Sequence, residues 1–426
     1  MSTGPALARR LGTGDAVVIG LGSMIGAGVF AAFAPAAQAA GAGLLVGLLI
    51  AAVVAYCNAT ASAQLAAQYP VSGGTYVYGR ERLGEWWGFL AGWGFVVGKT
   101  ASCAAMALTF AAYAAPAGWQ RPVAVAAVLG LTAVNYRGVT RTAGLTRIIV
   151  TVVLTALAVA VTAGLLGGEA GAGGSGTWTA SDGGVYGVLQ SAGLLFFAFA
   201  GYARIATMGE EVRDPERTIP RAIPLALGIA VAVYAVVAMA LLEVLGPEGI
   251  AATAAPLAAA VDGSGWTWAA PVVRVGAAAA ALGALLALIA GVGRTSLAMA
   301  REGDLPRFLA AVHPRFHVPH RAEIALGVLV CCLVLTVDLR GAIGFSSFGV
   351  LLYYVVANAA ALTQDREHRR FPRALQVLGA FGCLVLVATL PWEAVVGGLA
   401  VFAVGIAYRA TRLRLAARPE EHRTPS

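Results

Sequence analysis

The chain has 426 residues, of which 59% are hydrophobic and only 12% are charged, and its formal net charge is +8. A water-soluble core of this length cannot bury so much apolar surface, so a large part of it must face lipid. The arginines lie in short loops between apolar runs rather than along one soluble face, so we expect no nucleic-acid partner.

Apolar runs long enough to cross a bilayer, which takes about 20 residues, follow one another along the chain. In the first half they predict six helices, near residues 14–38, 43–68, 85–114, 121–136, 145–166 and 185–208. In the second half they predict six more, near residues 222–245, 270–299, 322–339, 342–363, 373–390 and 392–409. The sequence therefore predicts an all-α polytopic membrane protein with 12 transmembrane helices.

The arginines predict the orientation of these helices. Alternate loops hold Arg80 and Arg82, Arg137 and Arg141, and then Arg213, Arg217 and Arg221, whereas residues 167–184 contain no lysine or arginine. Because cytoplasmic loops are enriched in basic residues, we expect a plasma (inner) membrane protein with cytoplasmic tails at 1–13 and 410–426. Residues 167–184 are then an extracellular glycine-rich loop.

The first predicted helix carries a group of glycines in mid-membrane, at Gly20, Gly22, Gly26 and Gly28. Each weakens a helix by roughly 1 kcal/mol relative to alanine, so the group predicts a break. A break would free the amides of Ala27, Gly28 and Val29 to bind a carboxylate. The alternative is close helix packing through small residues, which is common in membranes.

The sixth predicted helix carries a matching feature, because Phe197, Phe199 and Tyr202 surround Gly201. Glycine-interrupted helices at corresponding positions of two halves indicate a transporter's midplane site. Freed carbonyls of Phe197, Phe199 and Ala200 could accept hydrogen bonds from an ammonium group, and the rings could add cation–π attraction. A carboxylate and an ammonium together describe an amino acid. The alternative is that the aromatic residues only pack against other helices or lipid.

Four segments resemble the amino acid–polyamine–organocation superfamily of permeases: GSMIGAGVF (22–30), YPVSGGTYVYGRERLG (69–84), FFAFAGYARIATMGEEVRDPERTIPRAI (196–223) and MAREGDLPR (299–307). The resemblance implies a LeuT-like fold with inverted repeats at 14–166 and 185–363 and two peripheral helices at 373–409. It also implies alternating access for amino acids.

The resemblance further implies that Ala27 and Gly28 contact the substrate carboxylate and that the carbonyls of Phe197 and Ala200 contact its ammonium group. Phe197 or Tyr202 would be the occluding aromatic residue. Many relatives have an acidic residue directly after the glycine–aromatic pair, but Ala203 and Arg204 follow here. The candidate substrate-binding residues are Met24, Ile25, Gly26, Ala27, Gly28, Lys99, Phe197, Phe199, Ala200, Gly201 and Tyr202.

Lys99 is the only lysine of the chain and lies midway along the third predicted helix. A charge at this depth costs several kcal/mol, so it usually faces a cavity or a partner. Lysine can lose its proton where arginine cannot, so Lys99 could carry a transported proton or act as a fixed cation beside the substrate. The alternative is a purely structural lysine that bonds backbone carbonyls.

The coupling or gating candidates are Lys99, Phe197 and Arg204. Arg204 would pair with Glu210 or Glu211 at an inner gate, or else its side chain would simply extend to water. Some proton-coupled relatives have a lysine in the fifth helix, but the stretch around Val153 is apolar here. Proton, sodium and counter-substrate coupling therefore stay open.

The sequence predicts a secondary active amino acid permease rather than an enzyme, with a neutral or acidic substrate favoured by Lys99. Polyamine or other amine exchange, or a membrane sensor that binds amino acids without transporting them, are the alternatives. The expected partners are a small amino acid or amine, a coupling proton or counter-substrate, and the lipid bilayer. We expect no organic cofactor, and the loop histidines His313, His317 and His320 to be solvated rather than metal ligands.

Overall fold

The computed structural model describes residues 11–70, 73–138, 143–167, 183–209 and 211–416. These residues form helices and no strand, apart from an isolated bridge between Leu11 and Val212. Among them, nine helices are long and apolar enough to cross a membrane. The prediction of an all-α polytopic membrane protein is therefore confirmed.

In the first half of the chain, each predicted span contains a helix. The bounds are α1 Thr13–Met24, α2 Ala27–Ala31, α3 Phe33–Ala40, α4 Leu44–Gln68, α5 Thr75–Leu83, α6 Glu85–Ala114, α7 Gln120–Tyr136, α8 Ala143–Leu166, α9 Gly184–Phe199, the 3₁₀ turn η1 Ala200–Tyr202 and α10 Ala203–Ala206. We call α1 to α3 the first span, and α9 to α10 the sixth span.

The second half follows the same plan. The bounds are α11 Pro215–Ala251, α12 Pro256–Asp262, α13 Ala269–Arg301, the 3₁₀ turn η2 Arg307–Ala310, α14 His320–Thr336, α15 Leu339–Leu362, α16 Arg373–Thr389 and α17 Trp392–Ala416. The helices at the fourth, ninth and eleventh predicted positions, α7, α14 and α16, have 17 residues each. All twelve predicted apolar runs are thus helical.

Three elements depart from the predicted ranges. The helices α5 and α12 were not predicted, because α5 mixes aromatic with charged residues and α12 has only 7 residues. Helix α11 starts at Pro215, well before the predicted residue 222, since a proline in the first turn gives up no helical hydrogen bond. Near its other end α11 is kinked at Gly246, which has a φ of 64°.

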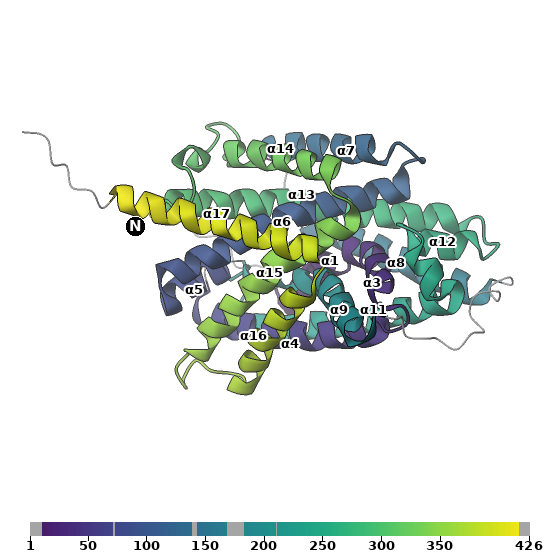
Figure 1. Cartoon of the computed structure of the whole chain (residues 1–426), viewed down its shortest axis with the longest axis horizontal. Helices are drawn as coiled ribbons and strands as arrows, with labels where there is room; N and C mark the ends of the chain where they lie inside the picture. Colours follow the sequence, from purple (N-terminus) through teal and green to yellow (C-terminus); the bar gives the residue numbers. More distant parts are fainter. Residues whose placement is uncertain (1–10, 71–72, 139–142, 168–182, 210, 417–426) are drawn as a thin grey trace, which may run out of the picture.

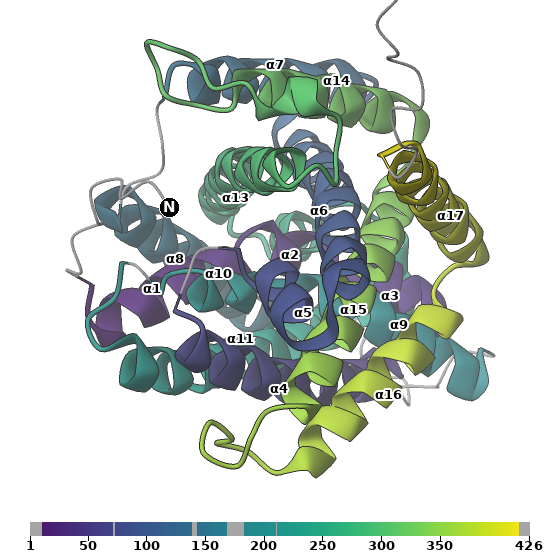
Figure 2. The ribbon, with the colours of Figure 1, turned by 90° about the vertical axis from the view of Figure 1, so that its left-hand side faces the viewer.

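The helices run mostly along the long axis of the molecule, with α5 at one end and α12 at the other (Figure 1). Helix α6 packs against α13 and α15, and α4 packs against α9 and α11. Figure 2, viewed from the end that carries α5, shows α7 and α14 together at one outer edge and α17 at another. The interrupted first span lies among these helices, so the candidate site is surrounded by protein.

The outer helices present apolar side chains outward. On α17, Leu399 is 58% and Val404 65% exposed, and on α16 Phe381 is 64% exposed. Such a surface is unfavourable in water but suits the hydrocarbon region of a bilayer. It agrees with the assignment of α16 and α17 to the membrane.

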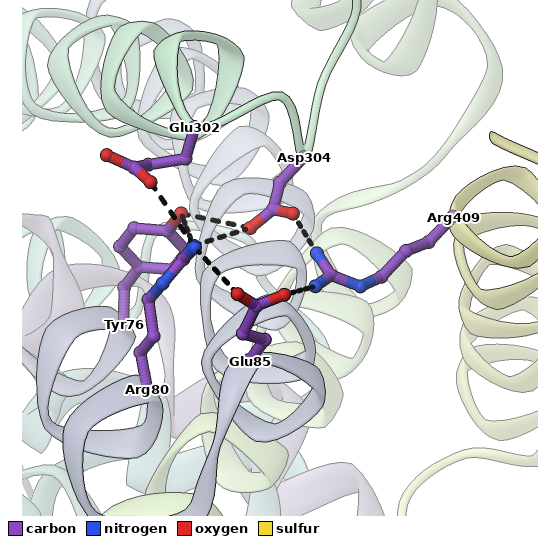
Figure 3. Close-up of polar contacts among 6 residues, drawn as sticks. All are labelled: Tyr76, Arg80, Glu85, Glu302, Asp304 and Arg409. Atoms are coloured by element: carbon purple, nitrogen blue, oxygen red, sulfur yellow. Dashed lines mark hydrogen bonds and ion pairs between the residues drawn. The ribbon is translucent and has the colours of Figure 1, made fainter. Parts of the chain in front are cut away.

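A cluster of charged groups joins four elements at the end of the molecule that carries α5 (Figure 3). Asp304, which follows α13 and is 4% exposed, accepts a hydrogen bond from the Tyr76 hydroxyl at 2.9 Å and forms an ion pair with Arg409 of α17. Arg80 of α5 lies 3.7 Å from the same carboxylate. We call Tyr76, Arg80, Glu85, Glu302, Asp304 and Arg409 the end cluster.

The outer members of the end cluster complete the connection. Glu85, at the start of α6, lies 3.4 Å from Arg80 and 3.3 Å from Arg409, and Glu302 lies 3.3 Å from Arg80. The Arg409 guanidinium also lies 5.1 Å from the Trp86 ring centroid. Residues of α5, α6 and α17 therefore meet the segment that follows α13 at one end of the molecule.

Candidate functional site

The first span is interrupted at Ile25 and Gly26. The Ile25 amide still donates to the Leu21 carbonyl at 2.7 Å, but Gly26 has φ −57° and ψ −145°, which is not helical. Helix α2 starts at Ala27 with no side-chain cap at its first turn. Within α2, the amides of Ala27 and Gly28 have no carbonyl four residues back, and those of Gly26 and Gly28 donate to no backbone carbonyl of the described residues. These amides are therefore available to a ligand.

The sixth span changes helix type rather than opening. It passes from α9 into the 3₁₀ turn η1 at Ala200–Tyr202 and continues as α10. The sixth span is therefore interrupted around Gly201 by a 3₁₀ turn, in which backbone bonds run three residues back instead of four. The carbonyls of Phe197, Phe199 and Ala200 thus lie at or beside a tightened turn.

The two spans touch through glycines. A Cβ on Gly201 would lie 2.6 Å from the Met24 amide nitrogen and closer still to the Ser23 carbonyl group. A Cβ on Gly28 would lie 2.7 Å from the Cα of Ala198. Both positions therefore need glycine, since any side chain would push one backbone away from the other. The interruption of the first span and the 3₁₀ turn of the sixth are held in direct contact.

Two buried tyrosines bond the backbone of these spans. Tyr234 of α11 places its hydroxyl 2.6 Å from the Met24 carbonyl and 3.0 Å from the Ala198 carbonyl. Tyr113 of α6 donates to the Phe30 carbonyl at 3.1 Å. Neither residue was predicted from the sequence. For Tyr234 the available signal was a single polar group in an otherwise apolar run, because a buried tyrosine hydroxyl usually finds a partner.

The three aromatic residues of the sixth span pack against different helices. The Tyr202 ring contacts Tyr354 of α15 at 5.3 Å between centroids, and the Phe199 ring contacts Tyr234 of α11 at 5.0 Å. Phe197 instead belongs to a cluster that contains Ala31 after the first-span interruption and Cys103 of α6. Phe197 and Tyr202 thus belong to different clusters, and both clusters include residues of α2 and α6.

Lys99 is buried on α6, with 9% of its surface exposed. It makes no hydrogen bond or ion pair with any residue that the structure describes. Cys103, one turn further along the same helix face, belongs to the cluster that holds Phe197 and Ala31. Lys99 thus lies on the same face of α6 as Cys103.

The other polar candidates form local contacts. Arg204 of α10 lies 3.4 Å from Glu211, while Glu210 lies outside the described residues. Ser102 of α6 bonds Ser346 of α15 at 2.6 Å. Among the described residues, no group of three or more histidine, cysteine or acidic side chains could hold a metal ion.

A small cavity adjoins the first-span interruption on the side of α8. It is lined by Gly22, Ile25, Gly26, Ile149, Val150 and Val153. Its walls carry no charged side chain, and Val153 is the residue at which the sequence analysis noted the absence of a fifth-span lysine. A coupling group contributed by α8 would have to come from another position.

A helical membrane protein with an interrupted first span in contact with the sixth has the architecture of a membrane transporter. The chain matches the amino acid permease family over residues 11–409 and belongs to this family.

The relatives agree with this assignment. An uncharacterized transporter of Mycobacterium tuberculosis is 63% identical over 401 residues, which cover 94% of this chain and 90% of the relative. A branched-chain amino acid permease of Bacillus subtilis is 25% identical over 94% of this chain and 92% of its own length. A cationic amino acid transporter of Arabidopsis thaliana is 30% identical over 84% of this chain and 66% of its own length.

Proposed function

We propose that the chain is a secondary active amino acid permease that works by alternating access and binds a zwitterion where the first span is interrupted beside the sixth. The observation that carries this proposal is the glycine contact of Gly201 with Ser23 and Met24, and of Gly28 with Ala198. A substrate bound beside this contact would touch both spans at once. Its binding can then change their relative position, which alternating access requires. The repeats would be residues 14–166 and 185–363.

In the proposed site, the amides of Ala27 and Gly28 receive the substrate carboxylate, since they lie in the first turn of α2 and lack a carbonyl partner within that helix. The carbonyls of Phe197 and Ala200 receive the ammonium group. The Ala198 carbonyl, which lies between them in sequence, already accepts a bond from Tyr234. Phe197 is the aromatic residue proposed to cover the substrate, because its helix α9 packs directly against α2.

Lys99 sets the charge preference in this proposal. A buried lysine without an anionic partner repels a second positive charge, so a cationic side chain is disfavoured and a neutral or acidic one is accepted. Among the relatives, one is named for branched-chain and another for cationic amino acids. Lys99 makes the first of these substrate classes the better expectation for this chain.

The test is uptake of radiolabelled amino acids into proteoliposomes that contain the purified protein. A competition panel of neutral, acidic and cationic amino acids and polyamines would be run at two pH values, with and without sodium. Saturable uptake inhibited by neutral amino acids supports the proposal. Inhibition by polyamines alone would favour an amine exchanger, and saturable binding without flux would favour a sensor.

The proposed location is the inner membrane with both tails in the cytoplasm. The end cluster supports it, since Arg80, Asp304 and Arg409 come from three arginine-containing segments that share one end of the molecule. Modification of single cysteines placed at residues 82 and 262 with an impermeant thiol reagent tests it. In intact cells the reagent should reach residue 262 and not residue 82.

A further inference from the structure

Tyr234 holds an unusual position between the first and sixth spans. It lies on α11, is 1% exposed, and its ring contacts Phe199 at 5.0 Å between centroids. Its hydroxyl bonds the Met24 carbonyl at 2.6 Å and the Ala198 carbonyl at 3.0 Å. One hydroxyl proton is therefore shared between two backbone oxygens that are 174 residues apart in the chain.

Both carbonyls need a partner because of the interruptions themselves. Met24 is the last residue of α1, so the amide that would bond its carbonyl in a continuous helix belongs to Gly28, beyond the interruption. In the sixth span, the amide of Tyr202 bonds three residues back in the 3₁₀ turn and leaves the Ala198 carbonyl without its α-helical partner. Tyr234 bonds the two oxygens that these changes release.

Backbone carbonyls from two interrupted spans that converge on one point are a common way to bind a monovalent cation in transporters. Here the point of convergence is occupied by a neutral hydroxyl, and the ring behind it fills the space toward α11. We propose that the Tyr234 hydroxyl is a positioning group that holds the two interrupted spans in register, in the place where converging carbonyls would otherwise hold a monovalent cation.

This role connects Tyr234 to the substrate through the backbone. Met24 is three residues before Ala27, and Ala198 lies between Phe197 and Ala200, so the bridge sets the distance between the amides and the carbonyls of the site. The inference rests on the proposed substrate site. It adds that the spacing of the carboxylate and ammonium pockets depends on a side chain that touches neither group.

The experiment compares Tyr234→Phe with Tyr113→Phe. Both changes remove one buried hydroxyl and keep a ring that packs on an aromatic neighbour, but the Tyr113 hydroxyl bonds the first span without also bonding the sixth. The probe is the strongest ligand from a panel of the twenty proteinogenic L-amino acids, measured by equilibrium binding to the purified full chain. Tyr234→Phe should weaken binding roughly tenfold or more, because it leaves two buried carbonyls unpaired. Tyr113→Phe should bind as the wild type does, even if it melts at a lower temperature.

A second arm uses only the wild-type protein, so it remains decisive if Tyr234→Phe fails to fold. Replacing sodium by choline should leave the affinity of the wild type unchanged, since no cation is needed between the carbonyls. Equal affinity of a folded Tyr234→Phe variant and the wild type would overturn the inference, and so would a wild type that binds only in sodium. If the wild type bound no member of the panel, the proposed function would fail instead, and the two failures are therefore distinct.

Discussion

Replacing Gly201 by alanine is the sharpest test of the contact between the first and sixth spans. The added Cβ would lie 2.6 Å from the Met24 amide nitrogen, whereas ordinary van der Waals contact begins near 3.4 Å. Gly201 does not have a positive φ, so alanine fits the local backbone conformation and the whole penalty comes from this contact. The two spans must separate by about 1 Å to admit the methyl group.

A displacement of this size matters more for binding than for folding. The groups proposed to bind the substrate lie on both sides of the contact, and a 1 Å misplacement of such groups can cost about 10²-fold in activity. We therefore expect Gly201→Ala to lower the rate of amino acid uptake by roughly 100-fold in proteoliposomes. The protein should still insert and purify as a helical monodisperse species, which circular dichroism and gel filtration would show.

The matched control is Gly228→Ala on α11, where a Cβ would meet nothing within 4 Å. Alanine in a helix interior is favoured over glycine by roughly 1 kcal/mol, so this variant should be as active as the wild type and slightly more stable. If Gly201→Ala took up substrate at the wild-type rate, the two spans would not need their observed contact. The proposed site would then have to be abandoned.

Three further predictions concern the lysine and the end cluster. In Lys99→Ala, cationic amino acids should inhibit uptake of the substrate, because this change removes the buried positive charge. In Lys99→Arg, which keeps the charge, they should not. Identical competition profiles of the two variants would contradict the proposed selectivity. Arg409→Gln should lower the free energy of unfolding by about 2–4 kcal/mol in a denaturation assay, since it leaves Asp304 buried without its closest cation. The control Arg414→Gln, on the exposed face of α17, should change the free energy of unfolding by less than about 0.5 kcal/mol in the same assay. Burial raises the pKa of Tyr76 above its ordinary value of about 10. The stability from its bond to Asp304 is therefore complete below pH 10 and is lost as the pH rises further. The melting temperatures of wild type and Tyr76→Phe, measured from pH 7 to 11, should converge only at the alkaline end.

The sequence predicted the spans well because hydropathy reports burial in lipid directly. The run that became α6 is apolar on both sides of Lys99, so its predicted bounds, 85–114, are those of the helix. Helix α5 was missed for the opposite reason. Its sequence TYVYGRERL carries too many polar groups to read as a span, and what makes it helical is packing against α6 and α15.

The site was predictable only in part. Lys99 stood out because it is the only lysine, and Gly26 because of its glycine neighbours. The change of the sixth span to a 3₁₀ turn could not be foreseen, since Gly201 fits an open break and a tight turn equally well. The role of Tyr234 depends on two carbonyls from distant parts of the chain, and no pattern within α11 indicates them.

The ion pair between Asp304 and Arg409 has a consequence for biogenesis. The acid is made 105 residues before its partner, and the last helix must enter the bilayer before the pair can form. Until then, the Asp304 carboxylate has the Tyr76 hydroxyl and the Arg80 guanidinium of α5 as its partners. A chain that ends before α17 therefore lacks the Arg409 guanidinium that neutralises the buried Asp304 carboxylate.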